Sequence, residues 1–270
     1  MDLATDNVIG IVGGMGPQAG MALFNSIIAN TNASTDQQHL PVVLMSYPGH
    51  IVDRTAFLEG STAVNPAYSI VEIIMKLEKA GANTIGIACN TVYSSRIYRV
   101  ILEELNRMNS AVNIVNMPLE TCRRIREQFP LSNRVGVMST NGTYRSAVYN
   151  DLLQDWGYDV IIPDPAFQND VIHRMIYDQE FGLKANGKDL KPEAGLLLDK
   201  TLDFFSAKGA DTIVLGCTDL SWDFKERVKR NIQIIDSTEA LAIALIRQAT
   251  GSSQPAVLIN TDNHKYLSEK

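Results

Sequence analysis

An internal repeat is the feature of this sequence that most restricts how the chain can fold. The segment 81–85 (Gly-Ala-Asn-Thr-Ile) leads to Cys89, and the segment 209–213 (Gly-Ala-Asp-Thr-Ile) leads to Cys217 at the same distance along the chain. A repeated unit of this kind indicates a duplicated structural element. The two cysteines therefore occupy equivalent places in two related halves.

A second pair of segments repeats with nearly the same spacing. The segment 9–11 (Ile-Gly-Ile), followed by Gly16, is echoed by the segment 135–137 (Val-Gly-Val), followed by Gly142. The two repeats differ slightly in register, as expected for a duplicated strand-and-helix domain with small loop changes.

Short β-branched runs alternate with amphipathic stretches along most of the chain. This alternation predicts right-handed βαβ units and parallel sheets with helices on both faces. The predicted strands are 8–12, 41–47, 84–88, 113–115, 134–138, 160–162, 212–215 and 232–235. The predicted helices are 18–31, 71–80, 96–108, 119–129, 144–156, 169–182, 192–207 and 238–249. With the repeat, the pattern predicts an α/β fold of two pseudo-symmetric lobes, each a parallel-type sheet flanked by helices, with the active site in the cleft between them.

The boundary between the lobes is expected near Asn116-Met117-Pro118. Residues 1–117 together with about 230–270 form the predicted first lobe, and residues 118–229 form the second. The strand near Ile232 follows the completed second repeat, so we expect that strand and the next helix to return to the first lobe. No element is predicted for the polar tail 251–270.

The composition excludes several classes of protein. The 30 acidic and 24 basic residues give a net charge of -6 without a basic stripe, so nucleic acid is not an expected partner. No stretch approaches the roughly 18 to 20 apolar residues of a membrane span, and the start of the chain lacks the basic residues of a signal peptide. We therefore expect a cytoplasmic protein without membrane contact. The three cysteines form no CxxC pair, and none lies at ligand spacing to a histidine, which predicts free thiols and no metal site.

A glycine-rich turn, 13–17 (Gly-Gly-Met-Gly-Pro), follows the first predicted strand. It departs from the dinucleotide pattern GxGxxG, because Gly20 falls one position late and Pro17 lacks an amide donor. A nucleotide-binding turn and a purely structural turn remain alternatives. The interpretation we favour is a tight turn whose backbone at Met15 and Gly16 approaches a small carboxylate at a helix N-terminus.

Cys89 and Cys217 each end a predicted strand and precede small polar residues that can cap a helix. Ligands of open α/β sheets bind beyond the carboxyl ends of the strands, and a helix dipole there is expected to lower the pKa of a thiol. Inverting a stereocentre requires a base on one face and an acid on the other. Two thiols facing one another across a cleft therefore predict exchange of the α-proton of a small amino acid. The alternative is that Cys89 and Cys217 are buried structural cysteines. We interpret Cys122, which has no counterpart in the repeat, as such a packing residue.

These motifs resemble those of the aspartate/glutamate racemase superfamily, and of aspartate racemases in particular. The resemblance runs over about residues 8–249 and rests on 88–91 (Ala-Cys-Asn-Thr), 216–219 (Gly-Cys-Thr-Asp) and the glycine turn. It implies a pseudo-symmetric two-lobe fold, racemase activity that needs no cofactor, a small amino acid as substrate and, commonly, a homodimer.

The resemblance also implies a set of substrate-binding residues. Asp53 and Arg54 belong to a segment similar to the family's Asp-Arg-Thr, whose arginine binds the substrate's side-chain carboxylate. Lys184 lies in a segment similar to one that supplies a second cation, and Thr140 and Thr143 match a Thr-x-Gly-Thr turn. A bidentate arginine with a lysine as point charge favours a dicarboxylic amino acid. The alternatives are a surface ion pair for the arginine and a solvated loop for the lysine.

Two residues depart from the aspartate racemase pattern. Tyr93 stands where histidine is usual, which would resize the pocket and puts aspartate itself in doubt. Asp219 replaces glutamate and shortens a carboxylate near Cys217, which would alter how that thiol is held. His50 and His173 are interpreted as ordinary polar positions near a loop and a helix start.

The leading hypothesis is a two-base racemase for aspartate, in which Cys89 and Cys217 are catalytic. Backbone amides near Met15, together with Asn90, Thr91 and Thr218, are expected to hold the α-carboxylate while the carbanion forms. The alternatives are a glutamate or broad-specificity amino-acid racemase, a non-catalytic binding protein for acidic amino acids and, less favoured, a nucleotide-binding protein.

Overall fold

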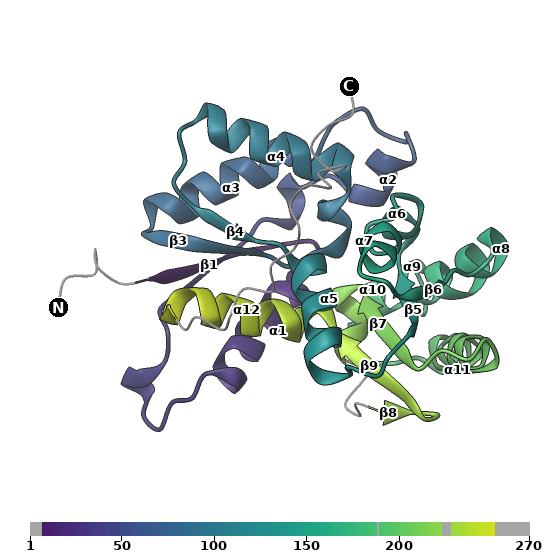
Figure 1. Ribbon diagram of the computed structural model, residues 1–270. Coiled ribbons are helices and arrows are strands. Elements are labelled where there is room, and N and C mark those ends of the chain that lie inside the picture. Colours follow the sequence, from purple (N-terminus) through teal and green to yellow (C-terminus); the bar gives the residue numbers. More distant parts are fainter. Residues whose placement is uncertain (1–6, 188, 223–227, 252–270) are drawn as a thin grey trace.

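The computed structural model describes residues 7–187, 189–222 and 228–251, and its strands form two sheets (Figure 1). The strands are β1 (Val8–Gly13), β2 (Val42–Ser46), β3 (Ala82–Ile87), β4 (Asn113–Val115), β5 (Arg134–Ser139), β6 (Asp159–Ile161), β7 (Thr212–Gly216), β8 (Val228–Lys229) and β9 (Ile232–Asp236). The predicted tail 251–270 lies outside the described residues apart from Gly251. Within the described ranges, no helix is both long enough and apolar enough to cross a membrane.

Helices cover the sheets and connect their strands. The α-helices are α1 (Pro17–Asn30), α2 (Arg54–Leu58), α3 (Ala67–Lys79), α4 (Ser95–Arg107), α5 (Met117–Gln128), α6 (Asn141–Arg145), α7 (Asn150–Asp155), α8 (Pro165–Phe167), α9 (Arg174–Tyr177), α10 (Leu183–Asn186), α11 (Pro192–Ala207) and α12 (Ser237–Thr250). Short 3-10 helices are η2 (Asp36–Gln38), η3 (Pro48–His50), η4 (Asn90–Tyr93) and η6 (Thr218–Trp222), and η5 (Gln168–His173) is a π-helix.

The two sheets have matching strand orders. The first sheet runs β2-β1-β3-β4 and the second runs β6-β5-β7-β9-β8, with all neighbours parallel except the β8–β9 pair. Strands β1, β2, β3 and β4 thus correspond to β5, β6, β7 and β9. The predicted α/β fold of two pseudo-symmetric lobes is confirmed, and each lobe consists of one sheet with the helices on it.

Buried apolar residues explain why these elements form. Every residue of β1 is buried, as expected for a parallel strand covered on both faces. On α4, Ile97, Ile101 and Leu105 recur every four residues and face the core, while most of the remaining positions are polar. The sheet faces and the helix stripes therefore meet in a common interior.

The last helix of each lobe crosses to the other lobe. Helix α12, shown in yellow beside α1 in Figure 1, follows β9 of the second sheet but packs on α1 and β3 of the first. Its Leu245 fills the space above Gly86, where a Cβ atom would clash. Helix α5 follows β4 of the first sheet and packs against α7 and β9 of the second, and the two crossing helices also pack on one another.

Three sequence predictions about these elements are wrong. The strand near Ile232 does not return to the first lobe, because the backbone of β9 hydrogen-bonds to β7 in the second sheet and only α12 crosses over. The single helix predicted over 144–156 is broken into α6 and α7, because Ala147 has a positive φ of 52° between them. Likewise, the helix predicted over 169–182 ends at Tyr177.

Candidate active site

A small pocket lies where the carboxyl ends of β1, β3, β5 and β7 meet. Its interior has a volume of about 10 Å³, roughly the space of one water molecule. Side chains from both lobes line it: Met15, Arg54, Cys89, Asn90, Thr91, Thr140, Tyr177, Lys184, Gly216, Cys217 and Thr218. Nine of the residues singled out from the sequence thus lie around one space, and the other three lie just outside this lining.

The two cysteines enter the pocket from equivalent positions. Cys89 follows β3 and caps η4, and Cys217 stands between β7 and η6. Both are free thiols and each is 6% exposed. The dipole effect expected for them has little basis, because the helices that follow are single short turns. For Cys217 the prediction of a lowered pKa is wrong: burial raises the pKa of its thiol, and the negative charge of Asp219 raises it further.

Arg54 brings a buried guanidinium to the side of the pocket near Cys89. It begins α2, whose first turn is capped by the Asp53 carboxylate accepting from the amide of Ala56 at 2.8 Å. Its Nη2 donates to the Met15 carbonyl at 3.2 Å and its Nη1 to the Val52 carbonyl at 3.3 Å, while Nε is buried without a partner. Within the described part of the chain, no ion pair joins Arg54 to a carboxylate, so its charge remains available to an anion.

The pKa of Arg54 responds to what surrounds the guanidinium. Burial alone lowers this pKa, but electrostatic interactions with Cys89, Tyr177 and Asp53 outweigh burial and leave it raised. The guanidinium is therefore charged. Of the two cysteines in the pocket, Cys89 is the one that interacts with this charge.

The side of the pocket near Cys217 holds a cation and a carboxylate together. The Nζ of Lys184 donates to Oδ2 of Asp219 at 2.6 Å, and the Sγ of Cys217 donates to the same oxygen at 3.5 Å. Burial lowers the pKa of Lys184, but Asp219 and Cys217 outweigh that effect and raise it. Lys184 is thus a charged lysine that already has a carboxylate partner within the protein.

Tyr177 joins the two lobes at the edge of the pocket, and the sequence reasoning missed it. Its hydroxyl donates to Oδ2 of Asp53 at 3.0 Å and lies 3.5 Å from Oγ1 of Thr55. Its ring stacks on His173 with centroids 4.4 Å apart. The Nζ of Lys184 lies over the Tyr177 ring, 5.3 Å from its centroid. Burial raises the pKa of Tyr177, so it remains a neutral donor. No motif spacing marks this residue in the sequence.

Three threonine hydroxyls form a cluster between the lobes. Oγ1 of Thr91 lies 3.1 Å from Oγ1 of Thr140 and 2.9 Å from Oγ1 of Thr143, and the latter two lie 3.4 Å apart. Thr91 and Thr140 line the pocket, and Thr143 supports them from behind. Gly142 permits this approach, because a Cβ atom there would meet the Thr91 methyl group at 2.7 Å.

Asn90 is held by residues of the second lobe and of α12. Its Nδ2 donates to Oγ of Ser237 at 3.0 Å, and its Oδ1 accepts from the Tyr149 hydroxyl at 2.6 Å. Ser237 in turn donates to the Leu215 carbonyl at 2.7 Å. Sequence reasoning missed both partners, although Ser237 directly follows β9 and so stands at the same edge of the sheet as Cys217.

The remaining sequence candidates lie outside the pocket lining. Tyr93 donates its hydroxyl to the Val115 carbonyl at 3.0 Å and packs on Tyr98, and it does not itself line the pocket; that it resizes the pocket stays a prediction. Gly16 precedes α1 as its N-cap residue. His173 accepts from the backbone amide of Asn141 at 3.2 Å, and its pKa is lowered by burial.

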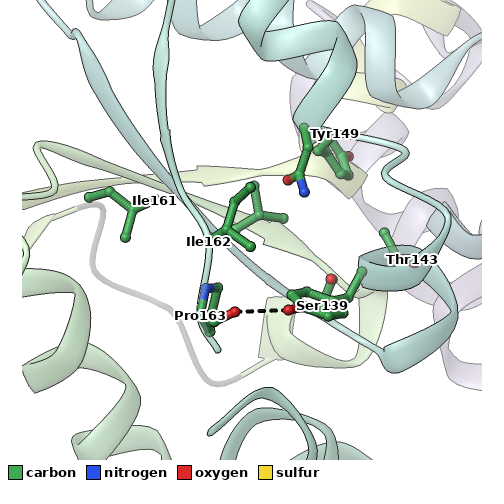
Figure 2. A pocket seen from close by; sticks show the side chains of 9 residues that line it. Ser139, Thr143, Tyr149, Ile161, Ile162 and Pro163 are labelled. Atoms are coloured by element: carbon green, nitrogen blue, oxygen red, sulfur yellow. Dashed lines mark hydrogen bonds between the residues drawn. The ribbon is translucent and has the colours of Figure 1, made fainter. Parts of the chain in front are cut away.

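A second pocket of similar size lies behind the threonine cluster (Figure 2). It lies between the carboxyl ends of β5 and β6 and the helices α6 and α7, and the Tyr144 hydroxyl donates to the Pro163 carbonyl at 2.8 Å beside it. Its lining contains no cysteine and no charged side chain: Val137, Ser139, Thr143, Tyr144, Tyr149, Asn150, Ile161, Ile162 and Pro163. The acid, base and cation groups are thus gathered in the first pocket. In the described ranges, no group of three or more His, Cys, Asp or Glu side chains is placed to hold a metal ion.

Comparison with known proteins gives a consistent result. The family described as Asp/Glu/Hydantoin racemase matches residues 12–245. The broad specificity amino-acid racemase RacX of Bacillus subtilis is 27% identical over 240 residues, which cover 87% of this chain and 95% of that protein.

Solved structures agree with this match. The aspartate racemase of Picrophilus torridus is similar with a TM-score of 0.74 and 29% identity, over 90% of this chain and 94% of its own. The glutamate racemase isoform RacE1 of Bacillus anthracis has a TM-score of 0.63 over 92% of this chain and 84% of its own, and at 17% identity it shows a shared fold.

Proposed function

Since this chain belongs to the Asp/Glu/Hydantoin racemase family and is an amino-acid racemase, an isomerase, we propose that it racemises aspartate by proton transfer between Cys89 and Cys217, without a cofactor. The observation that supports this most directly is the pair of cysteines lining one pocket from equivalent positions of two related lobes. A substrate α-carbon between them can lose its proton to one sulfur, and the resulting carbanion can regain a proton from the other.

The groups around the cysteines suit an amino acid with a charged side chain. Asn90 and the hydroxyls of Thr91 and Thr140 offer hydrogen bonds to the α-carboxylate, whose charge grows as the α-proton leaves. Among the residues that the structure describes, Arg54 has no carboxylate partner, and such a buried cation favours a second carboxylate on the substrate. The similarity to an aspartate racemase supports aspartate as that substrate.

The present shape of the pocket requires movement before an amino acid can bind. A volume of about 10 Å³ holds one water molecule, whereas aspartate has nine non-hydrogen atoms. We expect the lobes to separate where Tyr177 contacts Asp53, since this hydrogen bond spans the pocket edge. We expect this hydrogen bond to re-form when the lobes close over the bound substrate.

Two alternatives differ in substrate and in class. The similarity to RacX supports a broad-specificity racemase, and the Lys184–Asp219 pair fits this alternative because it leaves fewer free cations for a second carboxylate. A non-catalytic binding protein would use the same cations without moving a proton.

The homodimer implied by the family resemblance and the lobe boundary near residue 117 are further parts of this proposal, and light scattering of the purified protein tests the dimer.

Proton NMR in deuterated water tests the function directly. Enantiopure L-aspartate is incubated with the purified protein without pyridoxal phosphate, and the product is analysed on a chiral column. Loss of the Cα proton with appearance of D-aspartate supports the proposal. Exchange only with a wider set of amino acids indicates the broad-specificity alternative, and saturable binding without any exchange indicates the binding protein.

A further inference from the structure

The two cysteines of the pocket have equal exposure but opposite electrostatic neighbours. Each is 6% exposed. The buried cation of Arg54 interacts with Cys89, whereas Cys217 donates a hydrogen bond to the carboxylate of Asp219. The pseudo-symmetry of the backbone is therefore broken by the charges around the two sulfur atoms.

The contact between Cys217 and Asp219 defines which group carries a proton. Oδ2 of Asp219 accepts from the Lys184 ammonium at 2.6 Å, as an ionised carboxylate does. An ionised carboxylate can only accept hydrogen bonds, so the Cys217 sulfur, 3.5 Å from the same oxygen, must donate its S–H. A thiolate at this position would instead face a like charge.

The surroundings of Cys217 act in the same direction. Burial raises the pKa of this thiol most, Asp219 in η6 raises it further, and the approach of Cys89 after β3 also raises it. Lys184 in α10 and a backbone hydrogen bond at Asp219 lower this pKa, and the Lys184 ammonium is shared with the Asp219 carboxylate. These are the charged and titratable groups that act on the sulfur from the elements packed around it.

The charged neighbour of Cys89 has the opposite sign. Arg54 is buried and charged, and its Nε has no hydrogen-bond partner. A thiolate at Cys89 would neutralise this charge, because opposite charges in a buried site stabilise one another. No carboxylate among the described residues forms a hydrogen bond with Cys89.

On the basis of the proposed racemase function, we propose that Asp219 is a positioning residue that holds Cys217 as a thiol and thereby makes Cys89 the base of the resting enzyme. In the first half of the reaction the Cα proton passes to the Cys89 thiolate, and its bonding electrons stay on the substrate. Cys217 then gives its proton to the opposite face of that carbon. The product leaves with Cys89 as thiol and Cys217 as thiolate, and the reverse reaction or proton exchange with water restores the resting state.

Alkylation of the full-length protein without substrate tests this assignment. Thiolates react with iodoacetamide and thiols do not, and because the two cysteine residues have equal exposed fractions we expect their relative rates to follow ionisation. We expect carboxamidomethylation of Cys89 to be at least about tenfold faster than that of Cys217 at neutral pH, since one pKa unit corresponds to tenfold in thiolate fraction. Fully buried Cys122 serves as the internal reference for unfolding. Equal rates, or a faster Cys217, would overturn the proposal.

Three substitutions separate the role of Asp219 from a merely structural one. Asp219→Asn removes the negative charge beside Cys217 and should reduce the difference between the two cysteines to less than about threefold, and Asp219→Glu should restore it. Lys184→Met removes the opposing cation and should make Cys217 still slower. An unchanged ratio in Asp219→Asn contradicts the proposal, and if that variant does not fold, the native ratio and Lys184→Met still decide it.

The alkylation result does not depend on turnover. If the protein exchanges no α-proton but shows the expected labelling, the proposed function fails and the charge assignment stands. If it racemises aspartate but labels Cys217 first, the function stands and this inference fails.

Discussion

The hydroxyl of Tyr177 donates a hydrogen bond to Oδ2 of Asp53 at 3.0 Å, although the two residues are 124 positions apart in the chain. Asp53 also caps α2, the helix that begins with Arg54. This bond therefore connects the second lobe to the element that positions the buried cation of the first. The lobes meet here through one neutral donor and one carboxylate.

Replacing Tyr177 with phenylalanine should weaken this connection without removing the ring that stacks on His173. A hydrogen bond to a charged group contributes about 1.5 to 3 kcal/mol, so we expect kcat/KM for racemisation to fall by about tenfold or more. Steady-state kinetics of both enantiomers measure this. Tyr144→Phe is the matched control, because its hydroxyl bonds to a backbone carbonyl at the second pocket. Equal effects of both variants would contradict the role given to Tyr177.

Substituting either pocket cysteine with alanine should abolish racemisation, with a loss of at least about a thousandfold, because each sulfur serves one face of the carbanion. The remaining cysteine can still exchange the α-proton of one enantiomer with solvent. Proton NMR in deuterated water distinguishes exchange from inversion. Cys122→Ala should keep the activity, since Cys122 is fully buried away from the pocket. Normal racemisation by both pocket variants would exclude the two-base mechanism.

Arg54→Met should raise KM for aspartate and lower kcat/KM by about a hundredfold or more, because a desolvated cation for the side-chain carboxylate is lost. The activity toward neutral amino acids should fall less. Arg54→Lys should recover only part of the loss, since lysine lacks the planar pair of donors. Arg96→Met is a suitable control, as Arg96 is exposed and donates to the Leu58 carbonyl. A loss independent of the substrate's side chain would indicate a structural role for Arg54.

Glu120→Ala should destabilise the fold where the crossing helices meet. The carboxylate of Glu120 accepts from Arg247 of α12 at 2.6 Å and from Arg123 of α5 at 2.9 Å, and all three side chains are largely buried. Removing it leaves buried cations without a partner, which costs about 3 to 5 kcal/mol. Chemical denaturation measures the change. Glu104→Ala, which removes the partner of exposed Arg107, should cost about 1 kcal/mol or less.

Asp211 should contribute acid-dependent stability. Its pKa is lowered: burial alone would raise it, but hydrogen bonds from the Ser132 hydroxyl and from the amides of Asn133 and Arg134 outweigh burial. A lowered carboxyl pKa stabilises the fold above the unfolded value of about 3.9, and this stability is lost as the pH falls through the folded value. Asp211→Asn should therefore be less stable than the native protein at pH 7, and the difference should shrink toward pH 3. A difference that does not change between these pH values would contradict this account.

Much of the fold and part of the site could be predicted from the sequence. The positions of the strands follow from local runs of apolar residues such as those of β1 and β3, because burial on both faces demands them. Cys89 and Cys217 could be located because parallel strands present their carboxyl ends at one edge. The break at Ala147 could not be predicted, since an alanine carries no signal for a positive φ.

The sequence by itself determined the duplicated α/β pattern, the two cysteines at equivalent strand ends and the segment that carries Arg54. These features depend on neighbours along the chain, where spacing alone fixes which side chains share a face or an edge. Only the tertiary structure decided that β9 stays in the second sheet, that Tyr177 reaches Asp53 and that Lys184 and Cys217 share one oxygen of Asp219. Contacts of this kind join residues far apart in the chain, and they exist only because burial holds the two lobes together at distances that no local pattern specifies.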